Sequence, residues 1–137
     1  MRIYIDIDGV LLANEENPAQ YAEELIKYLA DNHDVYWLTT HCRGDAIPTQ
    51  KHIARHFPNQ DTLRALGRFK PTNWDTWKTE AIDFSQAFLW IDDDLFPEEQ
   101  EALEKFGVLD SFIQIDLAND MEQLNKVITR LQQLPTK

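Results

Sequence analysis

The feature that most constrains the fold is a repeated alternation of short apolar segments with segments of helical period. Residues rich in β-branched and aromatic side chains predict strands at 2–7, 35–38, 87–91 and 112–115. The second of these is short and carries no charge, as expected for a strand that is buried on both faces. The alternation predicts an α/β protein with a mainly parallel sheet covered by helices.

The intervening segments predict helices of ordinary length. Asn17-Pro18 is expected to open a helix that ends near Asn32, with Tyr21, Leu25, Tyr28 and Leu29 on one face. Further helices are expected at 49–56, at 76–84 and from Pro97 onward, and Met121, Leu124, Ile128 and Leu131 form the inward stripe of a closing helix. Between residues 42 and 73, prolines and Gly67 predict loops and one short strand. A chain of 137 residues is expected to form a single domain, residues 1–137.

The amino-acid composition of the chain indicates which kinds of binding partner and which cellular location to expect. The net charge is −11, which repels polyanions at long range and disfavours nonspecific nucleic-acid binding. Cys42 is the sole cysteine and has no internal disulfide partner, so we expect a reducing, cytoplasmic location. No apolar run approaches the roughly 20 residues of a membrane-spanning helix. The sequence leaves the oligomeric state open.

Acidic or hydroxyl residues end three of the predicted strands. Asp6 and Asp8 end the first strand, Thr39 and Thr40 the second, and Asp92 and Asp93 the third, whereas Asp94 is expected only to cap the turn before Pro97. Open α/β sheets bind their ligands at the carboxyl ends of the strands. These side chains are therefore expected to converge on one site.

The chemistry of such a site follows from its crowded carboxylates. Crowded carboxylates repel each other, and a Mg²⁺ ion with oxygen ligands relieves that repulsion. Asp6 and Asp92 are candidates to share the ion, Asp6 is placed to attack phosphorus, and Asp8 can act as acid and base. Gly9 lets the backbone turn so that amide groups face a phosphate, and Thr39 with Lys78 would complete the cradle.

In this order the residues resemble the haloacid dehalogenase superfamily. The four matching elements are Asp6-x-Asp8-Gly9-Val10, an apolar strand ending in Thr39, Lys78 opening a helix, and an apolar strand ending in Asp92-Asp93. They span residues 6 to 93 of the chain.

The resemblance implies a role for each residue. Asp6 would be the nucleophile, while Asp8 would be the acid/base and would give its backbone carbonyl to Mg²⁺. Thr39 and Lys78 would hold the phosphoryl group, with Thr40 a further contact by adjacency. Asp92 would bind Mg²⁺ with Asp93 in support.

The resemblance also implies a three-layer α/β/α Rossmann-like sheet, and the segments between the motifs are too short for the usual cap domain. An open, capless site suits a bulky phosphorylated substrate such as a nucleotide or a nucleic-acid end. The expected activity is Mg²⁺-dependent hydrolysis of a phosphomonoester through a phospho-aspartyl intermediate on Asp6.

Two other classes of protein share parts of this arrangement of acidic residues, Thr and Lys. A phospho-receiver domain gathers the same residue types, but its Lys comes last, whereas Lys78 here precedes the acidic triplet. A metal-binding interaction module that keeps the fold without turnover is the second alternative, and the intact Asp8 disfavours it.

Several neighbouring residues have two interpretations. His41 and Arg43 either line the approach to the phosphate or lie in a surface loop, and Trp74 and Trp77 either wall the pocket or anchor loops. His52 and His56 have the spacing of a zinc pair, but the sequence places no third ligand beside them, so we expect no zinc there.

Overall fold

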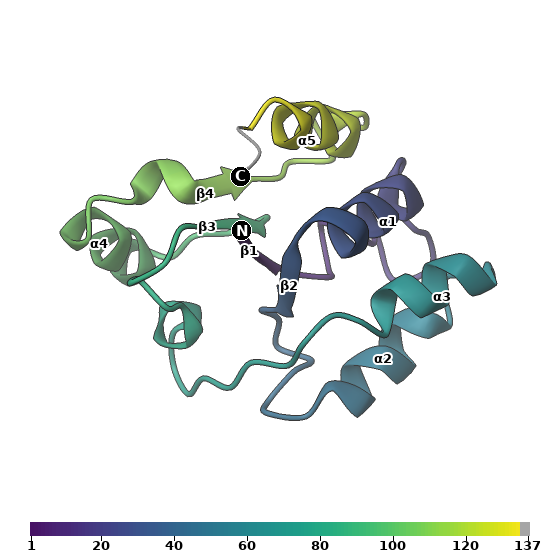
Figure 1. Ribbon diagram of the computed structural model, residues 1–137, viewed down its shortest axis with the longest axis horizontal. Coiled ribbons are helices and arrows are strands. Elements are labelled where there is room, and N and C mark those ends of the chain that lie inside the picture. The colour runs from purple at the N-terminus through teal and green to yellow at the C-terminus, as the bar shows by residue number, and fades with distance from the viewer. Residues whose placement is uncertain (135–137) are drawn as a thin grey trace.

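A computed structural model describes residues 1–134 and shows an open, four-stranded parallel sheet with helices packed around it (Figure 1). The α/β class and the parallel sheet are therefore confirmed. The strands are β1 (Arg2–Ile5), β2 (Asp34–Trp37), β3 (Phe88–Asp92) and β4 (Phe112–Gln114). The helices are α1 (Ala22–Asn32), α2 (Ala46–Ala54), α3 (Gln60–Leu66), α4 (Pro97–Lys105) and α5 (Gln123–Gln132), with short 3-10 turns η1 (Lys78–Ala81) and η2 (Leu109–Ser111).

The order of strands in the sheet is β2-β1-β3-β4. The chain runs from β1 through α1 to β2 on one side, and β3 then pairs with the other side of β1. The direction of winding therefore reverses between β1 and β3, which makes a topological switch point there. Ile5 pairs with Trp37 on one side and with Ile91 on the other, so the carboxyl ends of these three strands lie level.

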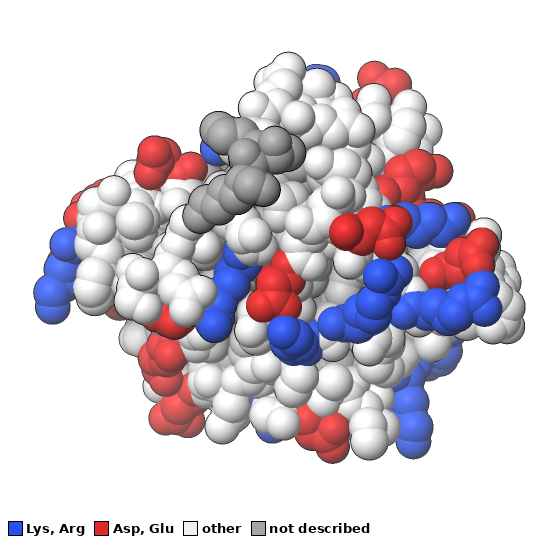
Figure 2. All heavy atoms as spheres, viewed as in Figure 1, with Lys and Arg blue, Asp and Glu red and all other residues white. Residues whose placement is uncertain are grey.

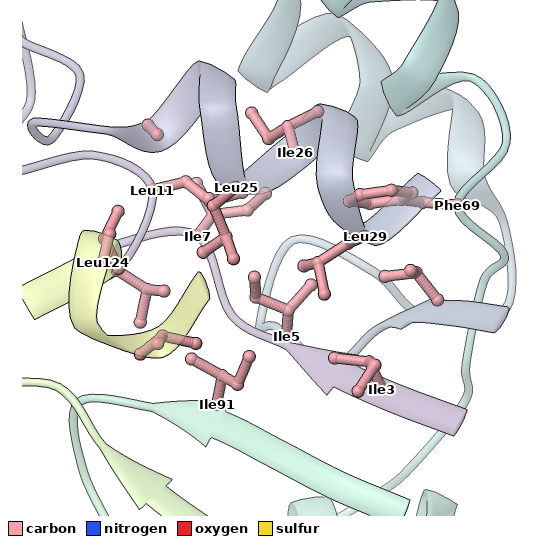
Figure 3. Packing of buried hydrophobic residues seen from close by; sticks show 14 of the residues in the cluster. Ile3, Ile5, Ile7, Leu11, Leu25, Ile26, Leu29, Phe69, Ile91 and Leu124 are labelled. Atoms are coloured by element: carbon pink, nitrogen blue, oxygen red, sulfur yellow. The ribbon is translucent and has the colours of Figure 1, made fainter. Parts of the chain in front are cut away.

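Alternate side chains of the strands enter two hydrophobic clusters, one on each face of the sheet. Ile3, Ile5 and Ile91 pack with Leu25 and Leu29 of α1 and with α5, as Figure 3 shows. Tyr4 and Trp90 instead pack against Leu103 of α4 in the second cluster. Figure 1 accordingly shows α4 on one side of the sheet and α1, α3 and α5 on the other.

Three of the predicted helices outside the segment 42–73 differ from those observed. The first begins at Ala22 rather than at Asn17-Pro18, because Leu12 bridges Pro18 and the Asn14 side chain accepts the backbone N–H of Asn17 at 2.9 Å. The predicted helix 76–84 is only the 3-10 turn η1. Met121 precedes α5 and is 65% exposed, so it is not part of the inward stripe that Leu124, Ile128 and Leu131 form.

The segment between residues 42 and 73 is more ordered than expected. It contains α2, which begins three residues earlier than the predicted Thr49, and α3, which was not predicted. Asp45 and Asn59 accept hydrogen bonds from Ile47 and Asp61 at 3.0 and 2.8 Å, so side-chain caps begin both helices. Lys70 forms an isolated parallel bridge with Tyr36 where one short strand was expected.

Opposite charges alternate on the face that Figure 2 presents. The ion pairs include Arg68–Asp31 at 3.1 Å and Lys70–Asp34 at 2.6 Å, and both are exposed. Pairs of this kind contribute little to stability, typically about 0–1 kcal/mol each. Among residues 1–134, no helix has the length and apolar character needed to cross a membrane.

Candidate functional site

The sheet brings Asp6 and Asp92 side by side at the switch point. Asp6 follows the last residue of β1, and its backbone N–H donates to the Ile91 carbonyl at 3.1 Å. Asp92 ends β3 and is 1% exposed, while Asp6 is 7% exposed. Two carboxylates are therefore buried together at the edge where parallel sheets bind their ligands.

Lys78 bridges the two carboxylates. Its ammonium nitrogen lies 2.7 Å from Asp92 Oδ2 and 3.2 Å from Asp6 Oδ2. Burial disfavours the charged ammonium, but the charges of Asp6 and Asp92 outweigh burial and raise the pKa of Lys78. Lys78 therefore stays cationic between the two acids.

Asp92 carries the most perturbed carboxyl group of the site. Burial, reinforced by the negative charge of Asp6 and opposed by Lys78, raises the pKa of Asp92 to about 8. Its oxygens accept hydrogen bonds from the Trp90 indole at 3.1 Å and from the Asp93 backbone N–H at 2.8 Å. The single ammonium leaves the buried acids short of positive charge, which a divalent cation would supply.

Asp93 completes a set of three acids. Asp6, Asp92 and Asp93 each offer a carboxylate oxygen, and these oxygens lie within 4.8 Å of one another. An all-oxygen set with one exposed member suits Mg²⁺, which keeps several of its waters. The donors present therefore fit the predicted ion.

Gly9 allows the loop after β1 to pass close to Asp93. Its φ of 78° lies in the left-handed region, and a Cβ atom at this position would overlap the Asp93 carboxylate. The loop then turns back, because the N–H groups of Val10 and Leu12 both donate to the Ile7 carbonyl at 3.1 Å. The predicted sharp turn is therefore present, but the Gly9 N–H donates to the Leu12 carbonyl at 2.9 Å, so the amide groups from Gly9 to Leu12 bond within the turn instead of facing an open phosphate site.

Asp8 lies outside the buried group and faces two histidines. Its side chain is 61% exposed, and its Oδ2 atom lies 2.8 Å from His41 Nε2. His52 Nε2 lies 3.8 Å from Asp8 Oδ1. Burial, followed by the nearby His41, lowers the pKa of His52. His41 thus contacts the predicted acid/base directly, whereas the sequence only placed it near the second motif.

The two threonines differ in their surroundings. Thr39 is fully buried directly after Leu38, and its hydroxyl oxygen accepts the His41 backbone N–H at 3.4 Å. Thr40 is exposed. Both lie at the carboxyl end of β2, beside the end of β1.

Arg43 and the two tryptophans make contacts within and between loops. Arg43 lies over the Trp74 ring at 3.9 Å and donates to the Trp74 and Asp75 carbonyls at 2.5 and 3.1 Å. Trp77 packs against Phe96 with ring centres 5.8 Å apart. Arg43 and Trp74 therefore tie the loop after β2 to the loop before Lys78.

Two glutamates that sequence reasoning did not select position Lys78. Glu99 of α4 is 2% exposed and accepts the backbone N–H groups of Lys78 and Phe96, each at 3.0 Å. Glu80 accepts the N–H groups of Asp75, Thr76 and Trp77 at 3.0, 3.1 and 2.8 Å. The sequence did contain one indication that Glu99 has a structural role. It lies three residues after Phe96, at the capping-box position of a helix that starts at Pro97.

A cavity of about 550 Å³ opens beside Asp8, with Asp8, Leu12, Asn14, His41, His52 and Arg55 in its lining. A larger cavity of about 750 Å³ lies at the opposite, amino-terminal edge of the sheet, near Arg2, His33 and Asp34. The clustered acids and Lys78 lie at the carboxyl edge, and the smaller cavity adjoins them through Asp8 and Gly9, so we associate the site with this cavity.

Comparison of the chain with family models, with curated proteins and with solved structures gives no match. The assignment of the site therefore depends on its own geometry and chemistry.

Proposed function

We propose that the protein is a Mg²⁺-dependent phosphomonoester hydrolase of the haloacid dehalogenase type. The observation that carries this proposal is the arrangement at the switch point, where Lys78 bridges Asp6 and Asp92. Asp8 lies two residues after Asp6 in the sequence and has an exposed side chain. We further propose a three-layer α/β/α architecture without a cap domain. The proposed location is the cytoplasm.

The first chemical step is attack of an Asp6 carboxylate oxygen on phosphorus. The bond from phosphorus to the ester oxygen breaks as the Asp6–phosphorus bond forms, and Asp8 gives its proton to the departing oxygen. The Thr39 and Thr40 hydroxyls and the Lys78 ammonium hold the phosphoryl oxygens. Lys78 suits this task because its charge is retained by the two flanking acids.

The second step returns the enzyme to its starting state. Asp8, now a carboxylate, takes a proton from a water molecule whose oxygen attacks phosphorus, and the bond to Asp6 breaks to release inorganic phosphate. Mg²⁺ bound by Asp6, Asp92 and the Asp8 carbonyl, with Asp93 in support, would supply positive charge that offsets the charge of the phosphoryl oxygens.

The cavity beside Asp8 supports a bulky leaving group. Asp8 must lie next to the oxygen that it protonates, so the rest of the substrate would extend into the space lined by His41, His52 and Arg55. These side chains suit a further anionic or aromatic group. The proposed substrates are nucleotides or phosphorylated nucleic-acid ends.

The test is hydrolysis of an aryl phosphate with Mg²⁺ and with a chelator. We expect Mg²⁺-dependent turnover in the wild type, none in Asp6→Asn, and a loss of about 10²–10⁴-fold in Asp8→Asn because proton transfer contributes that much. Acid quenching during turnover should trap phosphate on the wild-type protein and none on Asp6→Asn. Wild-type activity in Asp6→Asn would contradict the mechanism, and Mg²⁺ binding without hydrolysis of any phosphate ester would favour the interaction module.

A further inference from the structure

A second group of metal-ligating side chains borders the acidic site. Asp8, His41 and His52 each offer one ligand atom, and these three atoms lie within 4.8 Å of one another. They come from three places in the chain: the turn after β1, the turn after β2, and α2. Asp8 is shared between the two sites, because the proposed Mg²⁺ site uses its backbone carbonyl whereas this group uses its carboxylate.

We propose that Asp8, His41 and His52 bind a Zn²⁺ ion, and that the bound ion inhibits hydrolysis by occupying the carboxylate of the acid/base. The proposal that Zn²⁺ binds depends only on the donor atoms. The proposal that bound Zn²⁺ inhibits hydrolysis depends also on the proposed function. Two imidazoles and one carboxylate form a donor set for zinc-class transition metals, whereas Mg²⁺ selects oxygen ligands. The two sites would therefore select different ions.

The donor spacing matches a zinc site. Zinc–ligand bonds of about 2.0–2.1 Å in a tetrahedron place neighbouring donor atoms about 3.3 Å apart. His41 Nε2 lies 2.8 Å from Asp8 Oδ2 and His52 Nε2 lies 3.8 Å from Asp8 Oδ1, and these separations lie on either side of that value. All three donor atoms already lie within 4.8 Å of one another, so small side-chain movements would bring them to zinc distance.

The packing of the two rings already directs both Nε2 atoms toward Asp8. The His41 and His52 rings are stacked with centroids 3.8 Å apart and an interplanar angle of 18°. Thr49 of α2 donates to the His41 carbonyl at 2.9 Å, which ties the helix that carries His52 to the turn that carries His41. Because the rings are nearly parallel, binding of one ion by both Nε2 atoms would require the two rings to rotate relative to each other.

His52 supplies an independent sign of an unfilled ligand position. Its Nε2 atom is inaccessible to solvent and has no hydrogen-bond partner among the described residues. An unsatisfied buried polar atom is unfavourable, and coordination would remove that penalty. Coordination through Nε2 requires the proton on Nδ1, where Arg55 makes an exposed contact of 3.4 Å that its guanidinium group can leave.

This arrangement differs from the His52 and His56 pair, at which the sequence led us to expect no zinc. His56 lies four residues from His52, yet their rings meet edge to face with centroids 6.0 Å apart. The partners that the sequence did not place beside His52 are His41 and Asp8, which are distant in the chain. Their approach depends on the switch-point topology and on the Thr49 contact.

The binding test is calorimetric titration of Zn²⁺ into the full chain with Mg²⁺ present and substrate absent. We expect one Zn²⁺ per chain, at least a tenfold loss of affinity in His41→Ala and in His52→Gln, and no loss in the control His33→Gln. Bound Co²⁺ should show visible absorption typical of a tetrahedral site in the wild type and lose it in His52→Gln. Circular dichroism checks that each variant is folded. If His41→Ala is unfolded, the Zn²⁺ affinity of His52→Gln alone tests the site.

Absence of saturable Zn²⁺ binding, or equal affinity in the wild type and both folded variants, would overturn the site. The variant Asp6→Asn should keep its Zn²⁺ affinity, so binding is tested whether or not the protein hydrolyses phosphate esters. For the inhibitory half, Zn²⁺ should inhibit wild-type hydrolysis at the concentration at which it binds and should inhibit His52→Gln at least tenfold less well. Full wild-type activity with Zn²⁺ bound would refute inhibition while leaving the binding site in place.

Discussion

At the scale of single residues, the site depends on a few positions where the backbone conformation and a neighbouring charged group restrict which residue type can be present. Gly9 is one of them, because its positive φ disfavours a side chain and the nearby Asp93 carboxylate leaves no space for one. Gly107 has a similar φ of 69° but nothing within 4 Å of its added Cβ position. Comparing substitutions at the two glycines therefore separates the effect of backbone strain from the effect of steric overlap with Asp93.

We predict that Gly9→Ala destabilises the protein more than Gly107→Ala does. Each substitution carries the strain of a left-handed alanine, about 1–2 kcal/mol, and Gly9→Ala adds the displacement of Asp93. Chemical denaturation measures both free energies of unfolding, and a Mg²⁺ titration should show weaker binding in Gly9→Ala alone. Equal destabilisation with equal Mg²⁺ affinity would show that Asp93 moves freely.

His33 provides a pH-dependent contribution away from the site. Burial, followed by the nearby terminal amine, lowers the pKa of His33 below its usual value, so the unfolded chain binds its proton more readily than the folded one does. Its stabilising contribution is present above about pH 6.5 and is lost as the pH falls below that value.

The variant His33→Gln should therefore lose less stability than the wild type does on acidification from neutral pH. The difference in slope is at most about 1.4 kcal/mol per pH unit for one group. Denaturant unfolding at a series of pH values measures it. His52 titrates in both proteins and cancels in the comparison, and parallel pH profiles would contradict the prediction.

At the scale of elements, Lys78 is positioned by α4 rather than by a helix of its own. Glu99 accepts the Lys78 and Phe96 backbone N–H groups with separate carboxylate oxygens. Glutamine offers one acceptor oxygen, so Glu99→Gln leaves a donor unsatisfied at a cost of about 1–3 kcal/mol. Glu98, the preceding residue of α4, is exposed and provides the matched control.

We predict that Glu99→Gln lowers both the melting temperature and kcat/KM, while Glu98→Gln changes neither. The loss of activity follows because a displaced η1 moves the Lys78 ammonium away from Asp6 and Asp92. Thermal unfolding and aryl phosphate kinetics measure the two effects. Unchanged kinetics in a destabilised Glu99→Gln would assign this glutamate to folding alone.

The elements also show where sequence reasoning succeeded. All four strands were predicted to within two residues, because buried parallel strands form continuous apolar runs with few alternatives. The start of α1 was predicted wrongly because Asn14 and Leu12 bind the Asn17-Pro18 segment, a side-chain and tertiary effect that periodicity does not carry. Helix α3 was not predicted because its seven residues are too few to display a helical period.

For the site, strand ends predicted which acids meet, since parallel strands align their carboxyl ends. The contacts of Asp8 with His41 and His52 were not predictable, because they depend on how two turns and α2 pack. Glu99 was hidden for a similar reason, since a capping residue of one helix serves the backbone of another segment.

At the scale of the whole molecule, the net charge of −11 opposes the approach of polyanions. We predict that added salt raises kcat/KM for a phosphorylated oligonucleotide relative to a small aryl phosphate, because screening weakens this repulsion. Steady-state kinetics at increasing salt and constant Mg²⁺ measure the ratio. A ratio that falls with salt would instead identify a local basic surface that attracts the nucleic acid.

The position of β1 between β2 and β3 has a consequence for the newly made chain. During synthesis, Asp6 precedes its partners Lys78 and Asp92, which follow only after β2, α2 and α3 have been made. Until then Asp6, the proposed nucleophile, has neither the Lys78 ammonium nor the Asp92 carboxylate beside it. A nascent chain would therefore carry no reactive aspartate, and chemical competence would arise only when β3 docks against β1.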